Sequence, residues 1–190
     1  MTLEPLAAEH LPGLTAAAAD PEVWRWMSVD ASASFADWFA AALARTDEVP
    51  FAILRDGAPV GGTSFLSIVP EHRRLEIGYT WLSRAQWRTG ANVEAKLLLL
   101  EHAFERLGAA RVEFKTDARN ERSRAALAAL PAQFEGVFRA HMLVRGGERR
   151  DSAYYAVIAN DWPAVKARLR ARVDAAVARA TASSSSGSGR

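Results

Sequence analysis

The sequence predicts one α/β domain of the α+β type, in which helices flank a central, mostly antiparallel mixed sheet of about seven strands. Three observations support this fold class. The chain has 190 residues and a hydrophobic content of 49%, which suit one domain with a proper core. Residues 50–82 are typical of three consecutive strands, and from residue 93 onwards helical and strand periodicities alternate. Glycine, proline and aspartate turn signals separate the segments.

The N-terminal part is expected to hold a short strand, two helices and three antiparallel strands. Asp20-Pro21 ends the first helix, and the second carries Phe35, Trp38 and Leu43 on one stripe. Asp56-Gly57 is a hairpin turn signal. The expected elements are a strand at Leu3–Pro5, helices near Leu14–Ala19 and Phe35–Arg45, and strands at Pro50–Leu54, Pro59–Val69 and Arg74–Leu82.

The C-terminal part alternates helices and strands before a final helix. Gly108 and Pro131 end helices, and Gly146-Gly147 joins two strands. The domain is expected to cover residues 1–172, and residues 173–190 to hold the end of the last helix and a flexible Ser/Gly-rich tail from Ser183. The expected elements are helices at Val93–Leu107 and Asn120–Leu130, strands at Arg111–Thr116, Gln133–Val144 and Asp151–Ile158, and a helix capped by Asp161.

Composition excludes several classes of function. The net charge is only +2, with 24 basic and 22 acidic residues, so charge gives no case for nucleic-acid binding. The chain has no cysteine, which excludes disulfides, thiolate metal sites and cysteine nucleophiles. The N-terminus does not resemble a signal peptide, and the longest apolar run, Leu97–Leu100, is too short to cross a membrane. We therefore expect a cytoplasmic protein without a membrane partner.

The strongest local signal is the junction between the strand that ends near Leu82 and the helix that follows. The polar loop Arg88–Asn92 leads into that helix, whose first backbone N–H groups lack intrahelical partners. The helix dipole makes this end a site for phosphate or pyrophosphate. Gly90 lets the backbone approach a ligand closely. The nucleotide-binding patterns GxGxxG and GxxxxGK[ST] are absent, and an ordinary strand–turn–helix connection explains the loop equally well.

Six segments in order resemble the GNAT superfamily of acetyltransferases, over about Leu3 to Leu169. Trp87–Ala95 resembles its acetyl-CoA loop, Gln/Arg-x-x-Gly-x-Gly/Ala, and Trp87 with Glu94-Ala95 is similar to the RimJ/RimL-type ribosomal-protein N-terminal acetyltransferases. The other matching segments are Leu75–Tyr79, Asp117–Arg124 with its Asn-x-x-Ser pattern, Phe134-Glu135-Gly136, Arg150–Tyr155 and Asp161-Trp162-Pro163.

The resemblance implies acetyl-CoA as co-substrate and no metal. The pantetheine arm would fill a gap between residues 79–82 and 111–116, bonded by backbone groups near Trp81 and Leu82 and, from the far side, by Asn120. Ser123 would protonate the departing thiolate. Asn120 is also a good helix N-cap, and Ser123 also fits an ordinary surface serine. The residues implied for the pyrophosphate are Arg88, Thr89, Gly90, Ala91, Asn92 and Val93.

Several positions depart from the family pattern. Asn92 stands where glycine or alanine is usual, and Pro131 where glycine usually follows the helix. Leu127 lies where many relatives place a tyrosine acid, so no phenol is available there. Met142 occupies the place of a glutamate base assigned in RimL-type enzymes. The cofactor loop is therefore better matched than the catalytic groups.

The base and the acceptor site are less defined. Glu76 and His141 are candidate bases, but Glu76 also fits a structural ion pair with an arginine, and a lone strand histidine is usually packed or exposed. Trp24 and Trp26 fit either the roof of the acceptor site or core aromatics, and His141 is a further candidate for acceptor binding. The basic C-terminal helix is typical of a solvated face, with a homodimer or RNA contact as alternatives.

Three functions remain open. The first is direct transfer of acetyl from acetyl-CoA to a protein N-terminal α-amine in a ternary complex. The second keeps this chemistry but uses a small amine, such as an aminoglycoside, polyamine or amino acid, and an acidic acceptor groove would favour it. The third is a non-catalytic acyl-CoA-binding module, which the missing tyrosine acid favours.

Overall fold

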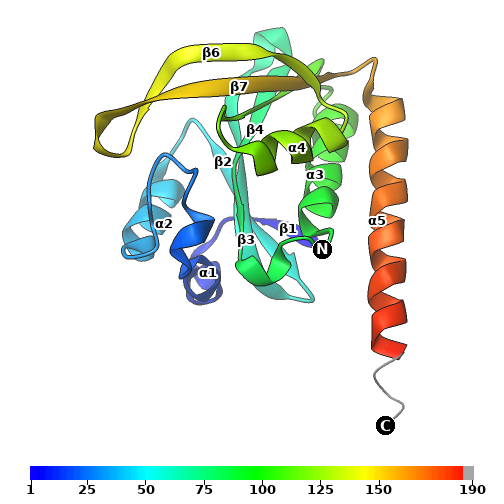
Figure 1. Cartoon of the computed structure of the whole chain (residues 1–190), viewed down its shortest axis with the longest axis horizontal. Coiled ribbons are helices and arrows are strands. Elements are labelled where there is room, and N and C mark those ends of the chain that lie inside the picture. The colour runs from blue at the N-terminus through cyan, green and yellow to red at the C-terminus, as the bar shows by residue number, and fades with distance from the viewer. Residues whose placement is uncertain (186–190) are drawn as a thin grey trace.

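The computed structural model describes residues 1–185, and its elements follow the predicted order (Figure 1). Seven strands form one sheet in the order β1-β2-β3-β4-β5-β7-β6. All neighbours are antiparallel except β4 and β5. The strands are β1 (Thr2–Pro5), β2 (Val49–Arg55), β3 (Ala58–Val69), β4 (Arg74–Leu82), β5 (Arg111–Asp117), β6 (Gln133–Val144) and β7 (Glu148–Ile158).

Helices cover both faces of the sheet. Helices α1 and α2 lie on one face, and α3, α4 and α5 lie on the other (Figure 1). None of the helices within residues 1–185 is long and apolar enough to cross a bilayer. The helices are α1 (Leu11–Ala18), α2 (Phe35–Ala44), α3 (Ala91–Glu101), α4 (Glu121–Ala129) and α5 (Trp162–Ser185), and a π-helical turn at His102–Arg106 extends α3.

Helix ends explain the small differences from the predicted bounds. Helix α3 begins at Ala91 instead of Val93 because Gly90 adopts a left-handed conformation, with φ of 92°, and forms its N-cap. Helix α5 continues through Ser183 to Ser185, where a flexible tail was predicted. The rest of that predicted tail, residues 186–190, lies outside the described residues.

Two hydrophobic clusters form most of the core. The first lies between the sheet and helices α3, α4 and α5, with Leu99, Leu100, Val112, Phe114 and Leu169 at its centre. The second joins α1 and α2 to the sheet and is rich in aromatic rings. Its largest members are Trp24, Phe35, Phe39 and Trp81.

The pairing of β4 with β5 is unusually short. It covers only three residue pairs, from Arg74↔Arg111 to Glu76↔Glu113, although both strands continue beyond them. The register of β4 against β3 also shifts beyond Gly78, and Tyr79 there has φ of 46°. Such a bulge bends a strand and redirects its side chains. The two strands therefore separate in the middle of the sheet.

Helix α5 packs directly against the loop that precedes α3. A Cβ placed on Gly90 would lie 2.7 Å from the Cβ of Ala176. Glycine is therefore required here for two reasons: its positive φ and the close approach of α5. From the sequence, glycine at this position was expected to let a ligand approach the backbone closely. In the structure, it is α5 that lies where a side chain of residue 90 would point.

We expect Gly90→Ala to destabilise the protein by more than the roughly 1–3 kcal/mol that a strained backbone alone costs. Gly146→Ala is the matched control, because Gly146 also has a positive φ, 68°, but nothing within 4 Å of its Cβ position. Urea denaturation of both variants measures the difference. Equal losses of stability would show that the contact with Ala176 is unimportant.

Candidate active site

A cavity of about 1200 Å³ occupies the region where β4 and β5 separate. Its lining includes the ends of both strands, from Ile77 to Leu82 and from Phe114 to Thr116. On the face that carries α3, α4 and α5 it reaches Gly90, Asn120 and Arg172, and on the other face it reaches residues between α1 and β2. The cavity thus connects the two faces of the sheet.

The loop before α3 forms one end of the cavity. Arg88, Gly90, Asn92 and Val93 line the cavity. Within the described chain, the N–H groups of Gly90 and Asn92 have no backbone or side-chain acceptor, whereas the Val93 N–H donates to the Gly90 carbonyl at 2.9 Å. Two free N–H groups at the start of a helix suit a phosphate oxygen.

Two predicted cofactor residues hold the loop together instead of lining the cavity. The Thr89 hydroxyl donates to the Gln86 carbonyl and accepts from Arg55 and from the Ala91 N–H. Ala91 itself is buried in a small core cluster. The prediction that both contact the cofactor is corrected here, because their polar groups and side chains are used inside the protein.

Three arginines gather at this loop: Arg84, Arg88 and Arg122. Arg84 and Arg122 both lie over the ring of Trp87, with the Arg122 guanidinium carbon 3.9 Å from the ring centroid. Burial lowers the pKa of Arg122; Glu22 opposes the shift, and the positive charges of Arg25, Arg84 and Arg88 add to it. A cation held among other cations is compensated when an anion binds between them.

The head of α4 forms the next part of the wall. The Asn120 side-chain oxygen accepts from the Ser123 N–H at 3.1 Å, so Asn120 is the N-cap of α4. It also lines the cavity, and its amide nitrogen remains available as a donor. Ser123 lines the cavity as well, and its hydroxyl makes no hydrogen bond to the described residues.

Trp81 and Leu82 lie in the β4 segment that borders the split, and both line the cavity. The Leu82 carbonyl accepts from the Trp87 ring nitrogen at 2.9 Å. The ring nitrogen of Trp81 is buried without a partner among the described residues. The contacts of Trp87 and the β4 bulge together fix the backbone of this segment.

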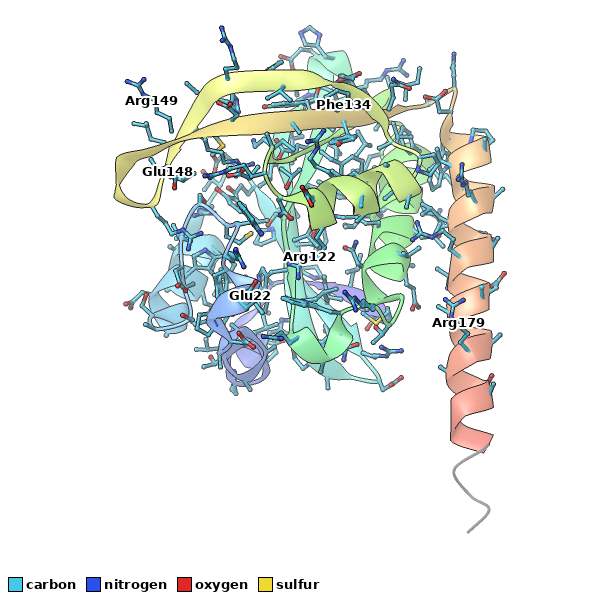
Figure 2. The ribbon with its side chains drawn as sticks, viewed as in Figure 1. Glu22, Arg122, Phe134, Glu148, Arg149 and Arg179 are labelled. Atoms are coloured by element: carbon cyan, nitrogen blue, oxygen red, sulfur yellow. The ribbon has the colours of Figure 1, made fainter. Side chains whose placement is uncertain are left out.

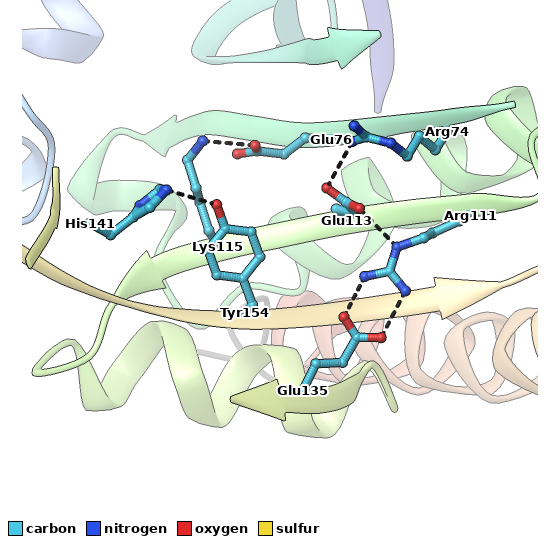
Figure 3. Close-up of polar contacts among 8 residues, drawn as sticks. All are labelled: Arg74, Glu76, Arg111, Glu113, Lys115, Glu135, His141 and Tyr154. Carbon is cyan, nitrogen blue, oxygen red and sulfur yellow. Dashed lines mark hydrogen bonds and ion pairs between the residues drawn. The ribbon is translucent and has the colours of Figure 1, made fainter. Parts of the chain in front are cut away.

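Glu76 lies at the point where the strands separate. It is buried, lines the cavity and pairs with Lys115 at 2.8 Å (Figure 3). The sequence suggested an arginine as the ion-pair partner of Glu76, but the partner is Lys115 of β5. Burial raises the pKa of the Glu76 carboxyl, and Lys115 opposes the shift. A buried carboxylate with a raised pKa is suited to accept a proton.

Lys96 is a buried cation of the cavity that the sequence interpretation missed. Its amine donates to the Thr80 hydroxyl at 2.6 Å and lies 5.5 Å from the Phe114 ring centroid. Burial lowers its pKa to about 7. One signal was present: Leu99, Leu100 and Ala103 follow Lys96 at helical spacing and are all buried, which places Lys96 on the inward face of α3.

His141 does not line the cavity. It is exposed on β6, where its ring nitrogens lie 3.1 Å from the Ser152 hydroxyl and 3.2 Å from the Tyr154 hydroxyl (Figure 3). Burial and the charges of Lys115 and Arg150 lower its pKa. The prediction of His141 as an acceptor residue is therefore corrected, since its ring is held against β7.

The two tryptophans between α1 and α2 have different places. Trp24 is fully buried, and its ring nitrogen donates to the Ala18 carbonyl at 2.8 Å. It is a core residue, which corrects its prediction as an acceptor residue. Trp26 does line the cavity, near the guanidinium groups of Arg25 and Arg119.

The far end of the cavity has mixed charge. Asp47 and Glu48 lie on one side, where Glu48 pairs with Arg45. Arg150 lies on the other side, and its Nε is buried without a partner among the described residues. The remaining lining here includes Trp26, Met27, Ser28, Tyr79 and Met142.

Comparison with known proteins gives a consistent result. Residues 1–133 match the acetyltransferase (GNAT) domain family. Over 99 residues the chain is 30% identical to the uncharacterised N-acetyltransferase YoaA of Bacillus subtilis (strain 168), an alignment that spans 52% of this chain and 55% of that protein.

Solved structures agree in fold. A candidate acetyltransferase from T. thermophilus is 44% identical and superposes with a TM-score of 0.82 over 90% of this chain and 92% of its own. RimJ of Mycobacterium smegmatis, in complex with CoA-disulfide, is 23% identical with a TM-score of 0.76 over 89% of this chain and 87% of its own. At that identity the likeness shows the fold alone.

Lys96 makes stability depend on pH. Its folded-state pKa is lowered from 10.5 to about 7, so between these values the unfolded chain binds a proton that the folded protein does not. The free energy of unfolding therefore rises from pH 7.5 to 9.5, by at most about 1.4 kcal/mol per pH unit from this group, and the burial cost is fully present below pH 7. Lys96→Met should remove this rise. Urea denaturation at each pH measures the free energy of unfolding of the parent protein and of Lys96→Met. If the two values changed with pH in parallel, Lys96 would not cause the rise.

Proposed function

Since this chain belongs to the GNAT family and is an acyl-CoA-dependent acetyltransferase, we propose that it transfers acetyl from acetyl-CoA to the α-amine of a protein N-terminus. The observation that carries the proposal is the continuous cavity through the split between β4 and β5. It joins an anion site on one face of the sheet to a groove of mixed charge on the other. A pyrophosphate at the first and an amine in the second would bring the thioester between them.

The cofactor end is matched by the chemistry of acetyl-CoA. The free N–H groups of Gly90 and Asn92 and the guanidinium groups of Arg88 and Arg122 suit its pyrophosphate. The amide nitrogen of Asn120 is a donor for a pantetheine carbonyl. We assign backbone groups of Trp81 and Leu82 to the arm and the thioester carbonyl, as an oxyanion-type contribution.

The catalytic roles follow from position and protonation. Glu76 takes a proton from the acceptor ammonium, directly or through water, and so leaves the neutral amine that attacks the thioester; it is the carboxylate where the strands separate. Ser123 gives a proton to the departing thiolate from the wall opposite β4. The acceptor lowers the demand on the base, because an α-amine has a pKa of about 8, against about 10.4 for lysine, and a weak base is then sufficient.

The acceptor end favours a peptide over a polyamine. Its cations, Lys115 and Arg150, repel a polycation, and two of its carboxylates, Glu48 and Glu76, already have cationic partners. The Nε of Arg150 needs an acceptor, which a peptide carbonyl supplies and a polyamine does not. Asp47 favours a small cationic amine as the second candidate, because it makes no ion pair within the described residues.

An acceptor panel tests the proposal. We expect release of free CoA with peptides that have a free α-amine, at a kcat/KM at least about tenfold above that for spermidine or an aminoglycoside, a ratio worth about 1.4 kcal/mol. Thiol reagents suit this assay because the protein has no cysteine. Matched peptides with a blocked N-terminus and a free lysine control for side-chain acetylation. Preference for spermidine would contradict the proposal, and so would tight CoA binding without turnover of any amine.

Variants test the two catalytic roles. Glu76→Gln should lower kcat by about 10²-fold and remove the acid limb of its pH profile, which lies above the ordinary pKa of a glutamate because burial raises it. Ser123→Ala should lower kcat by a similar factor, and Ser123→Thr should retain more activity than Ser123→Ala because it keeps a hydroxyl proton donor.

Acetyl-CoA affinity measured by calorimetry and melting temperature serve as controls for both variants. A kcat within a few-fold of the parent enzyme, with an unchanged pH profile, would remove Glu76 or Ser123 from the chemistry.

A further inference from the structure

Helix α5 has two parts with different surroundings. Its first part is built into the core through Trp162, Val165 and Leu169. Its second part passes the loop before α3, where Ala176 approaches Gly90. A helix predicted to present a mainly solvated charged face is therefore part of the cofactor end of the cavity.

One face of this second part lines the cavity. Its residues are Arg172, Ala175, Ala176 and Arg179, at positions i, i+3, i+4 and i+7 of the helix. Ala176 is the residue of this face that approaches Gly90. Arg172 donates to the Ala129 carbonyl at 2.7 Å, which holds its guanidinium at the end of α4.

The arginines at the cofactor end of the cavity therefore form two groups on separate elements. Arg84 and Arg122 lie over the ring of Trp87, next to Arg88 of the loop, whereas Arg172 and Arg179 belong to α5, the helix that packs against Gly90. Figure 2 shows Arg122 of α4 and Arg179 of α5. Two other basic residues of α5, Lys166 and Arg170, pair with Glu101 of α3 instead. Arg172 and Arg179 differ from these two residues in that they line the cavity.

We propose that Arg172 and Arg179 bind the phosphate on the ribose of coenzyme A, its 3′-phosphate. This inference rests on the proposed acetyl-CoA site, in which the first group of cations takes the pyrophosphate. Coenzyme A carries one further phosphate, a near-dianion, and guanidinium groups bind such oxygens in bidentate geometry. Two cation groups then correspond to two phosphate groups.

Binding of two ligands that differ only in this phosphate tests the proposal. Calorimetry compares coenzyme A with 3′-dephospho-coenzyme A. We expect Arg179→Met and Arg172→Met each to weaken binding of coenzyme A by about tenfold, as loss of a charge-assisted hydrogen bond does, and to leave binding of the dephospho form unchanged. Arg168→Met is the matched control, an exposed arginine of α5 outside the cavity lining, and should change neither.

Each other outcome overturns the assignment. Equal weakening of both ligands would place these arginines at the pyrophosphate, and no change in either would leave them without a role in binding. Arg172→Met also loses the bond to Ala129, so melting temperatures accompany the comparison, and Arg179→Met carries the test if Arg172→Met is unstable. This binding measurement does not depend on the acceptor, so failure of acetyl transfer leaves it intact. Failure of coenzyme A itself to bind the parent protein rejects both proposals.

Discussion

The parallel pairing of β4 and β5 stops after three residue pairs, and the rest of the site depends on this early end. Because the strands diverge, backbone and side chains of both become walls of a cavity instead of partners in a ladder. The bulge at Tyr79 assists the divergence, and the buried pair of Glu76 with Lys115 lies at its apex. One local interruption of the sheet therefore creates the route between its two faces, and a charged pair is tolerated there because the partners satisfy each other.

The two ends of this route differ in charge. Arginines from three elements gather at the end near α3, where a helix N-terminus adds partial positive charge. The opposite end combines carboxylates with Lys115 and Arg150. In the proposed complex, this difference in charge helps to orient the anionic co-substrate, with its phosphates at one end and its thioester toward the other. Helix α5 contributes to this asymmetry, since its contact at Gly90 brings the C-terminal part of the chain to the cofactor loop.

Local patterns predicted the element order, the seven strands and the anion loop, because turn residues and periodicity are properties of short segments. What they could not predict was which side chains the tertiary packing turns toward the cavity. Trp24 and His141 carry suitable chemistry but face the core and β7. Lys96 and Arg179 were missed, because a lysine within an apolar helix and an arginine in a basic one gain their roles only from the neighbouring elements. The early end of the β4–β5 pairing was implied only through the family resemblance.

A crystal structure of the protein with coenzyme A tests the central claim most directly. We expect the pyrophosphate at Gly90 and Asn92, the pantetheine arm between residues 77–82 and 114–116, and the sulfur toward Glu76 at the acceptor side of the sheet. Coenzyme A bound with its arm outside the split between β4 and β5, or with its sulfur on the face of α3, would contradict it.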